Sequence, residues 1–173
     1  GLGDVYKRQK LYSLSFSNVK TYLFVFLFVA GNIALPQLCH LVPMGGPTLL
    51  PIYFFTLIAA YKFGFRVGLL TALLSPVINH LLFGMPAAAA LPVLLIKSGL
   101  LAGAAAFAAR YTKKISLVAL LGVILAYQVI GTVFEWAICG NFFLAVQDFR
   151  IGIPGMLIQW FGGYALLKAI SKL

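Results

Sequence analysis

Long uncharged apolar runs constrain this chain more than any other feature. A helix needs about 20 mainly apolar residues to cross roughly 30 Å of hydrocarbon. Runs that meet or approach this length, bounded by Lys, Arg, Gly and Pro, cover about 21–39, 48–61, 67–82, 87–109, 115–136 and 151–167. The pattern predicts an all-α integral membrane protein with six transmembrane helices.

Composition supports the same class of protein. Apolar residues make up 62% of the 173 residues and charged residues 9%, against about 45–50% and about 25% in soluble domains. A water-soluble fold would therefore expose a large apolar area. This excludes a soluble enzyme and a disordered chain, and the two cysteines are too few for a disulfide scaffold.

Lys and Arg residues are distributed unequally between the two sides of the predicted membrane. Eleven of the 13 lie on one side, only Arg150 lies on the other, and Lys97 lies within a span. Because cytoplasmic loops retain positive charge, both termini are expected in the cytoplasm. The loops near 40–48, 83–87 and 138–150 then face outward. The net charge of +10 reflects this orientation, and no nucleic-acid partner is expected.

The first nine residues form a separate segment in this interpretation. They fit no signal peptide because they lack an apolar core, and they resemble a translated sequencing-adapter tail. We therefore expect a non-native tail at 1–9 and a single six-helix membrane domain at 10–173. Without Lys7 and Arg8 the charge asymmetry, and hence the predicted orientation, is unchanged.

Lys97 is the clearest candidate for a functional residue, because ionisable side chains within spans are costly. It lies ten residues after Ala87, about 15 Å deep in a helix, where its ammonium needs a partner. Two interpretations of Lys97 are open. In the first, its ammonium binds a ligand anion such as a carboxylate. In the second, it has a structural role, in an ion pair or with its ammonium extended to the membrane surface. Glu135 is the candidate internal partner. Because Glu135 is expected near the outer interface, a direct pair with Lys97 requires a kink or a vertical offset between helices. In the alternative, Glu135 faces the water outside.

Further polar residues are expected around an outward-facing cavity. Gln128, Thr132 and Glu135 are spaced to share one helix face. Thr71, Ser75 and Asn79 recur every four residues and form a polar stripe, with His80 beside its end. Thr71 and Ser75 are more typical of helix–helix contacts. The substrate-binding candidates are Lys97, Asn79, His80, Gln128, Thr132, Glu135 and Gln159.

The remaining polar and aromatic residues favour structural roles or leave two alternatives. Asp148 and Arg150 are close enough in sequence to pair locally, and Trp136 suits an interfacial belt. Trp160 either belongs to such a belt or stacks on a flat heterocycle. No catalytic motif and no phosphate-binding loop is present, so we expect neither an enzyme nor a cofactor. A metal site is not expected either, because the spacing is arbitrary for Cys39, His40, His80 and Cys139.

Several sequence segments resemble a known family. The Ala30–Ala34 segment (AGNIA) lies in the first span, and further segments that carry the resemblance lie at 35–40, 51–54, 83–86 and 150–155. With six short spans and cytoplasmic termini, residues 10–173 resemble the substrate-binding S component of energy-coupling factor (ECF) transporters. The sequences of these segments are similar to those of S components from Bacteroidetes.

The resemblance implies a substrate-capture subunit of an ABC importer in the bacterial cytoplasmic (inner) membrane. It binds a vitamin or related micronutrient from the outer side, under the loop between the first two spans. A T component and two cytoplasmic ATPase subunits complete the transporter. Ala30 and Ala34 are then expected at the interface with the T component, where small side chains let helices approach closely. Lys97 suggests a ligand with an anionic group.

Two other classes of function remain open. A structural or assembly membrane protein of the cell envelope would have the same small helical architecture but no small-molecule pocket. A solitary gradient-driven carrier would transport without an ATPase, although the sequence has no obvious inverted repeat.

Overall fold

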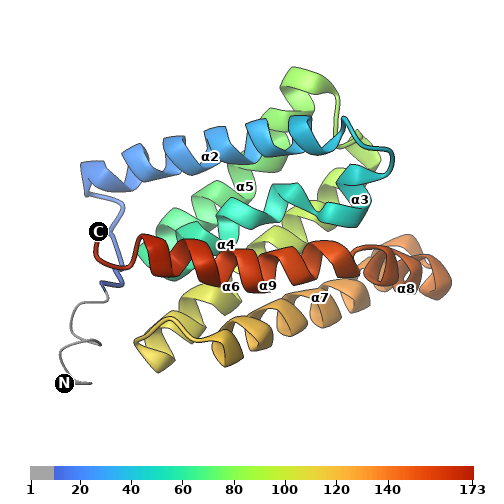
Figure 1. Ribbon diagram of the computed structural model, residues 1–173. Coiled ribbons are helices and arrows are strands. Elements are labelled where there is room, and N and C mark those ends of the chain that lie inside the picture. The colour runs from blue at the N-terminus through green and yellow to red at the C-terminus, as the bar shows by residue number, and fades with distance from the viewer. Residues whose placement is uncertain (1–9) are drawn as a thin grey trace.

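The computed structural model describes residues 10–173, and the predicted tail at 1–9 lies outside the described residues. The described chain is helical and contains no strand (Figure 1). Its helices are α2 (Val19–Cys39), α3 (Gly45–Leu49), α4 (Pro51–Phe63), α5 (Phe65–Phe83), the 3₁₀ turn η1 (Ala88–Ala90), α6 (Leu91–Thr112), α7 (Leu117–Cys139), α8 (Phe142–Ile151) and α9 (Ile153–Ala169).

Four helices are long and apolar enough to cross a membrane: α2, α5, α6 with η1, and α7. Many large apolar side chains on these helices are exposed, as expected for surfaces that face lipid rather than water. The predicted all-helical, multi-pass membrane protein is thereby confirmed in its coarse form.

Helix α4 lies at the centre of the bundle, in contact with α2, α5, α6 and α9. Its side chains are nearly all buried, including Leu57, Ile58 and Tyr61. Helix α5 approaches α4 closely at Gly68, where a Cβ would lie 2.4 Å from the Cβ of Ala60. The buried apolar core is therefore built around a helix only 13 residues long.

A buried asparagine joins three helices on one side of α4. Asn32 of α2 donates from Nδ2 to Thr56 Oγ1 of α4 at 3.1 Å and to Ser75 Oγ of α5 at 3.0 Å. Ser75 therefore makes the predicted helix–helix contact, whereas Thr71 donates to Val67 of its own helix. Sequence analysis assigned no role to Asn32, because its partners come from distant parts of the chain.

The two ends of the bundle differ in charge. Helices α4, α6 and α9 end where α2, α5 and α7 begin, at the left of Figure 1. The nine basic residues of the described chain near this end are Lys10, Lys20, Lys62, Arg66, Arg110, Lys113, Lys114, Lys168 and Lys172. Here Lys62 Nζ donates to the backbone oxygens of Lys10 and Ser171, which ties both ends of the described chain to α4.

Candidate ligand-binding cavity

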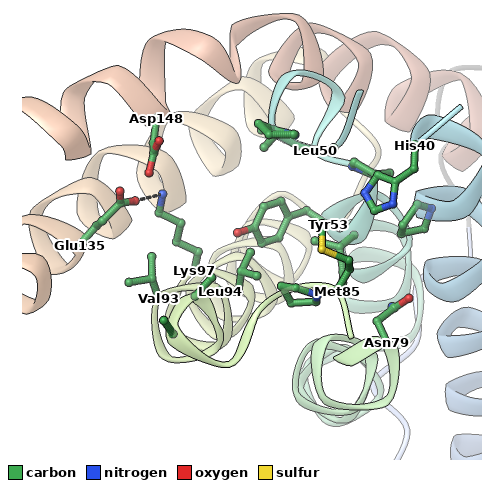
Figure 2. Close-up of a pocket in the computed structure, with 18 of the residues that line it drawn as sticks. His40, Leu50, Tyr53, Asn79, Met85, Val93, Leu94, Lys97, Glu135 and Asp148 are labelled. Atoms are coloured by element: carbon green, nitrogen blue, oxygen red, sulfur yellow. Dashed lines mark hydrogen bonds and ion pairs between the residues drawn. The ribbon is translucent and has the colours of Figure 1, made fainter. Parts of the chain in front are cut away.

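A cavity of about 510 Å³ lies at the end of the bundle opposite the basic residues (Figure 2). Its walls come from α2 through α8, including the 3₁₀ turn η1, and most of the lining is apolar or Pro and Gly. The lining residues with polar side-chain groups are Gln37, His40, Tyr53, Asn79, Lys97, Gln128, Glu135 and Asp148, with Cys139 beside them.

Helix α3 covers the cavity where sequence analysis expected the capping loop. Its N-cap Met44 and C-cap Leu50 both adopt left-handed backbone conformations, with φ of 60° and 50°, which turn the chain sharply on either side. The helix sits directly on α9, because a Cβ at Gly155 would lie 2.6 Å from the backbone oxygen of Leu49. The cap is therefore a short packed helix, with Gly46 and Leu50 facing the cavity.

Lys97 and Glu135 form a direct ion pair in the cavity wall, with 2.6 Å between Nζ and Oε1. Their side chains are only 9% and 3% exposed. Lys97 lies six residues after the start of α6 and Glu135 four residues before the end of α7, about 9 Å and 6 Å from those ends. The pair is formed directly, so Glu135 does not face outside water.

Gly131 allows the lysine side chain to reach its partner. It lies one turn before Glu135 on α7, and a Cβ there would lie 2.7 Å from Lys97 Cγ. The aliphatic part of Lys97 therefore crosses α7 over Gly131. A larger residue at this position would displace the lysine.

Asp148 of α8 is a third charged group at this end of the cavity. Figure 2 shows its carboxylate pointing toward Lys97, and the residue lines the cavity. The predicted local pair with Arg150 is not formed among the described residues. Asn141 caps α8 by accepting from the Leu144 N–H at 3.0 Å, and α8 directs Asp148 inward.

Only some of the predicted substrate-binding residues meet at the cavity. His80 is held by a hydrogen bond from Nδ1 to the Pro86 oxygen at 2.8 Å, and Thr132 donates to its own helix. Gln159 is buried and accepts from the Tyr127 hydroxyl. Those three are not among the lining residues. The predicted residues that line the cavity are Asn79, Lys97, Gln128 and Glu135.

The structure also places the tryptophan and the cysteines that the sequence analysis singled out. Trp160 donates from Nε1 to the Leu117 oxygen at 2.8 Å, near the basic end of the bundle, and does not line the cavity. Cys39 and Cys139 are both free thiols. The described residues contain no group of three metal-binding side chains.

Sequence reasoning missed Tyr53, which is buried in the cavity wall with its hydroxyl toward the Lys97 side (Figure 2). No sequence signal marks it, because it stands among apolar residues of the second run. The assembled site suits reversible binding of a small molecule, since ligand cavities have volumes of about 300–1,000 Å³, mostly apolar walls and a few polar groups.

Comparison with known proteins adds no relative: no family model, curated protein or solved structure matches the chain. The resemblance to ECF S components therefore stays a prediction.

Proposed function

We propose that this chain is the substrate-capture S subunit of an ECF-type importer in the bacterial cytoplasmic membrane. It takes a vitamin or related micronutrient from the outer side and delivers it with a T component and two ATPase subunits. The cavity of about 510 Å³ carries the proposal. It lies at the end away from the basic residues, and the positive-inside tendency assigns that end to the exterior.

Six spans are part of this proposal. Besides the four long apolar helices, α9 has 17 residues and α4 has 13. Helices α3 and α4 together run from 45 to 63 with a break at Leu50, and we propose that they act as one broken span. Irregular backbone within a membrane is tolerated where it is covered by protein or lines a cavity, and Leu50 lines the cavity.

The outer face of α2 is the proposed docking surface for the T component. Ala30 and Ala34 are exposed on this helix, while its opposite face contacts α4 and α5. Two small residues one turn apart allow a partner helix to approach closely. This face is separate from the cavity, so docking and ligand binding are expected to respond to different substitutions.

The cavity also favours capture over the structural alternative. An envelope assembly protein requires no enclosed site of ligand size, and it gives no reason for a charged cluster inside one. A solitary carrier needs the same cavity but no ATPase. Transport in liposomes that contain this chain alone separates that alternative from the proposed importer.

Two neighbouring alanines allow a matched test of capture. Ala90 lines the cavity, whereas Ala88, in the same exposed turn, does not. We expect Ala90→Trp to fill the cavity and abolish retention of small molecules, while Ala88→Trp leaves it unchanged. The measurement is mass spectrometry of compounds released on denaturation of each purified full-length protein. Equal retention by the two variants, or no compound released from the wild type, contradicts the proposal.

A further inference from the structure

The charges that face the cavity do not balance. Lys97 contributes one positive charge, and its ammonium is already engaged by Glu135 at 2.6 Å. Asp148 adds a second carboxylate, which points toward this pair (Figure 2) and forms no ion pair with a described residue. This end of the cavity therefore has two carboxyl groups, of the buried Glu135 and the exposed Asp148, and one ammonium group.

Asn79 is an independent polar feature of the same cavity. Its Nδ2 donates to the backbone oxygens of Asn32 at 3.0 Å and of Ser75 at 2.9 Å, which uses both N–H groups and identifies the other amide atom as the oxygen. That Oδ1 accepts no hydrogen bond within the described chain, although Asn79 is only 2% exposed. This oxygen is itself buried, so a molecule in the cavity does not reach it without a movement of Asn79.

The remaining lining is consistent with a ligand that has an apolar body beside one charged group. Figure 2 shows Tyr53, Leu94 and Met85 between the Lys97 side and the Asn79 side. Gln128, which also lines the cavity, already donates from Nε2 to the Tyr127 hydroxyl at 3.0 Å. The Asp148 carboxylate thus lines the cavity without an ion pair, while Lys97 and Gln128 each already donate one hydrogen bond.

We propose that the cavity binds a small organic cation, either an amine or a protonated nitrogen heterocycle. Its charged nitrogen contacts Asp148 and Glu135, and its apolar body lies along Tyr53 and Leu94. This inference rests on the proposed function, because it names the substrate class of the same site. It replaces the anionic ligand suggested by Lys97 alone, since Glu135 already neutralises that lysine.

An anionic ligand is disfavoured by the same geometry. It would have to displace Glu135 from Lys97 and then lie beside two carboxylates, Glu135 and Asp148. Like charges in a partly dehydrated cavity repel more strongly than they do in bulk water. A cation, in contrast, can bind without breaking the Lys97–Glu135 pair.

Tryptamine and indole-3-propionate provide matched probes, because they share an indole N–H and carry opposite charges. Each is titrated calorimetrically into the full-length protein in detergent. We expect saturable tryptamine binding at least tenfold tighter than indole-3-propionate binding.

Two variants of α8 test the position of the charge. Asp148→Asn should weaken tryptamine binding about tenfold. Gln147→Lys makes the same change in net charge at a neighbouring residue outside the cavity lining, and should change binding less than about twofold. Tighter binding of indole-3-propionate, unchanged tryptamine affinity in Asp148→Asn, or no saturable tryptamine binding overturns the inference.

Failure of the proposed function has its own readout. If the wild type releases an anionic compound on denaturation and Ala90→Trp does not, capture stands and the cation inference fails. If the wild type releases no compound, the capture function itself fails.

Discussion

Removal of Lys97 should destabilise the protein more than removal of its partner Glu135. The two side chains are almost fully buried and paired at 2.6 Å, and breaking such a pair from one side costs about 3–5 kcal/mol. At about 2–4 °C per kcal/mol for a chain of this size, Lys97→Met should lower Tm by roughly 6–20 °C. The variant leaves Glu135 and Asp148 together without a nearby cation.

Glu135→Leu should cost less, because Lys97 can turn to Asp148, which points toward it in Figure 2. The double variant Lys97→Met/Glu135→Leu should recover most of the loss, since replacing both members of a buried pair by apolar residues is often neutral. Thermal unfolding in detergent, followed through Trp136 and Trp160 fluorescence, measures all three. Additive losses in the double variant, or a larger loss from Glu135→Leu than from Lys97→Met, refute this reasoning.

Two further predictions concern close contacts. Gly131→Ala should lower Tm and displace Lys97, because its Cβ would lie 2.7 Å from Lys97 Cγ. The matched Gly122→Ala lies on the same helix, where a Cβ would have no heavy atom within 4 Å, and should stabilise the protein by up to about 1 kcal/mol. Tm changes of the same sign for both variants in thermal unfolding would contradict this reasoning. Ala34→Trp should block co-purification with a T component while compounds are still retained, whereas Val129→Trp, on an exposed site of α7, should permit it. Normal complex recovery with Ala34→Trp would exclude α2 as the interface.

The coarse fold could be predicted because it depends on composition and local pattern. Apolar runs of sufficient length identified the long helices α2, α5, α6 and α7, and the asymmetry of Lys and Arg corresponds to the two ends of the bundle. The six-span topology and the family remain predictions, because α4 and α9 are shorter and comparisons match no relative.

The site was predicted only where residues on one helix determine it. Lys97 and Glu135 could be named, because a charge within an apolar run is conspicuous, but their direct contact depends on how α6 packs against α7. Asp148 was assigned to a local pair, because the direction of α8 follows from a left-handed Gly140 and the Asn141 cap. Tyr53 carried no signal, since its exposure to the cavity arises from the α3–α4 break.

The most direct test of the central claim is native mass spectrometry of the full-length chain, purified in mild detergent from cells that express it with its cognate T component and ATPases. The proposed function predicts a complex of this chain with one T subunit and two ATPase subunits, and a small molecule released on denaturation. A lone chain without a bound compound, or a complex with cell-wall synthesis proteins instead, would contradict it.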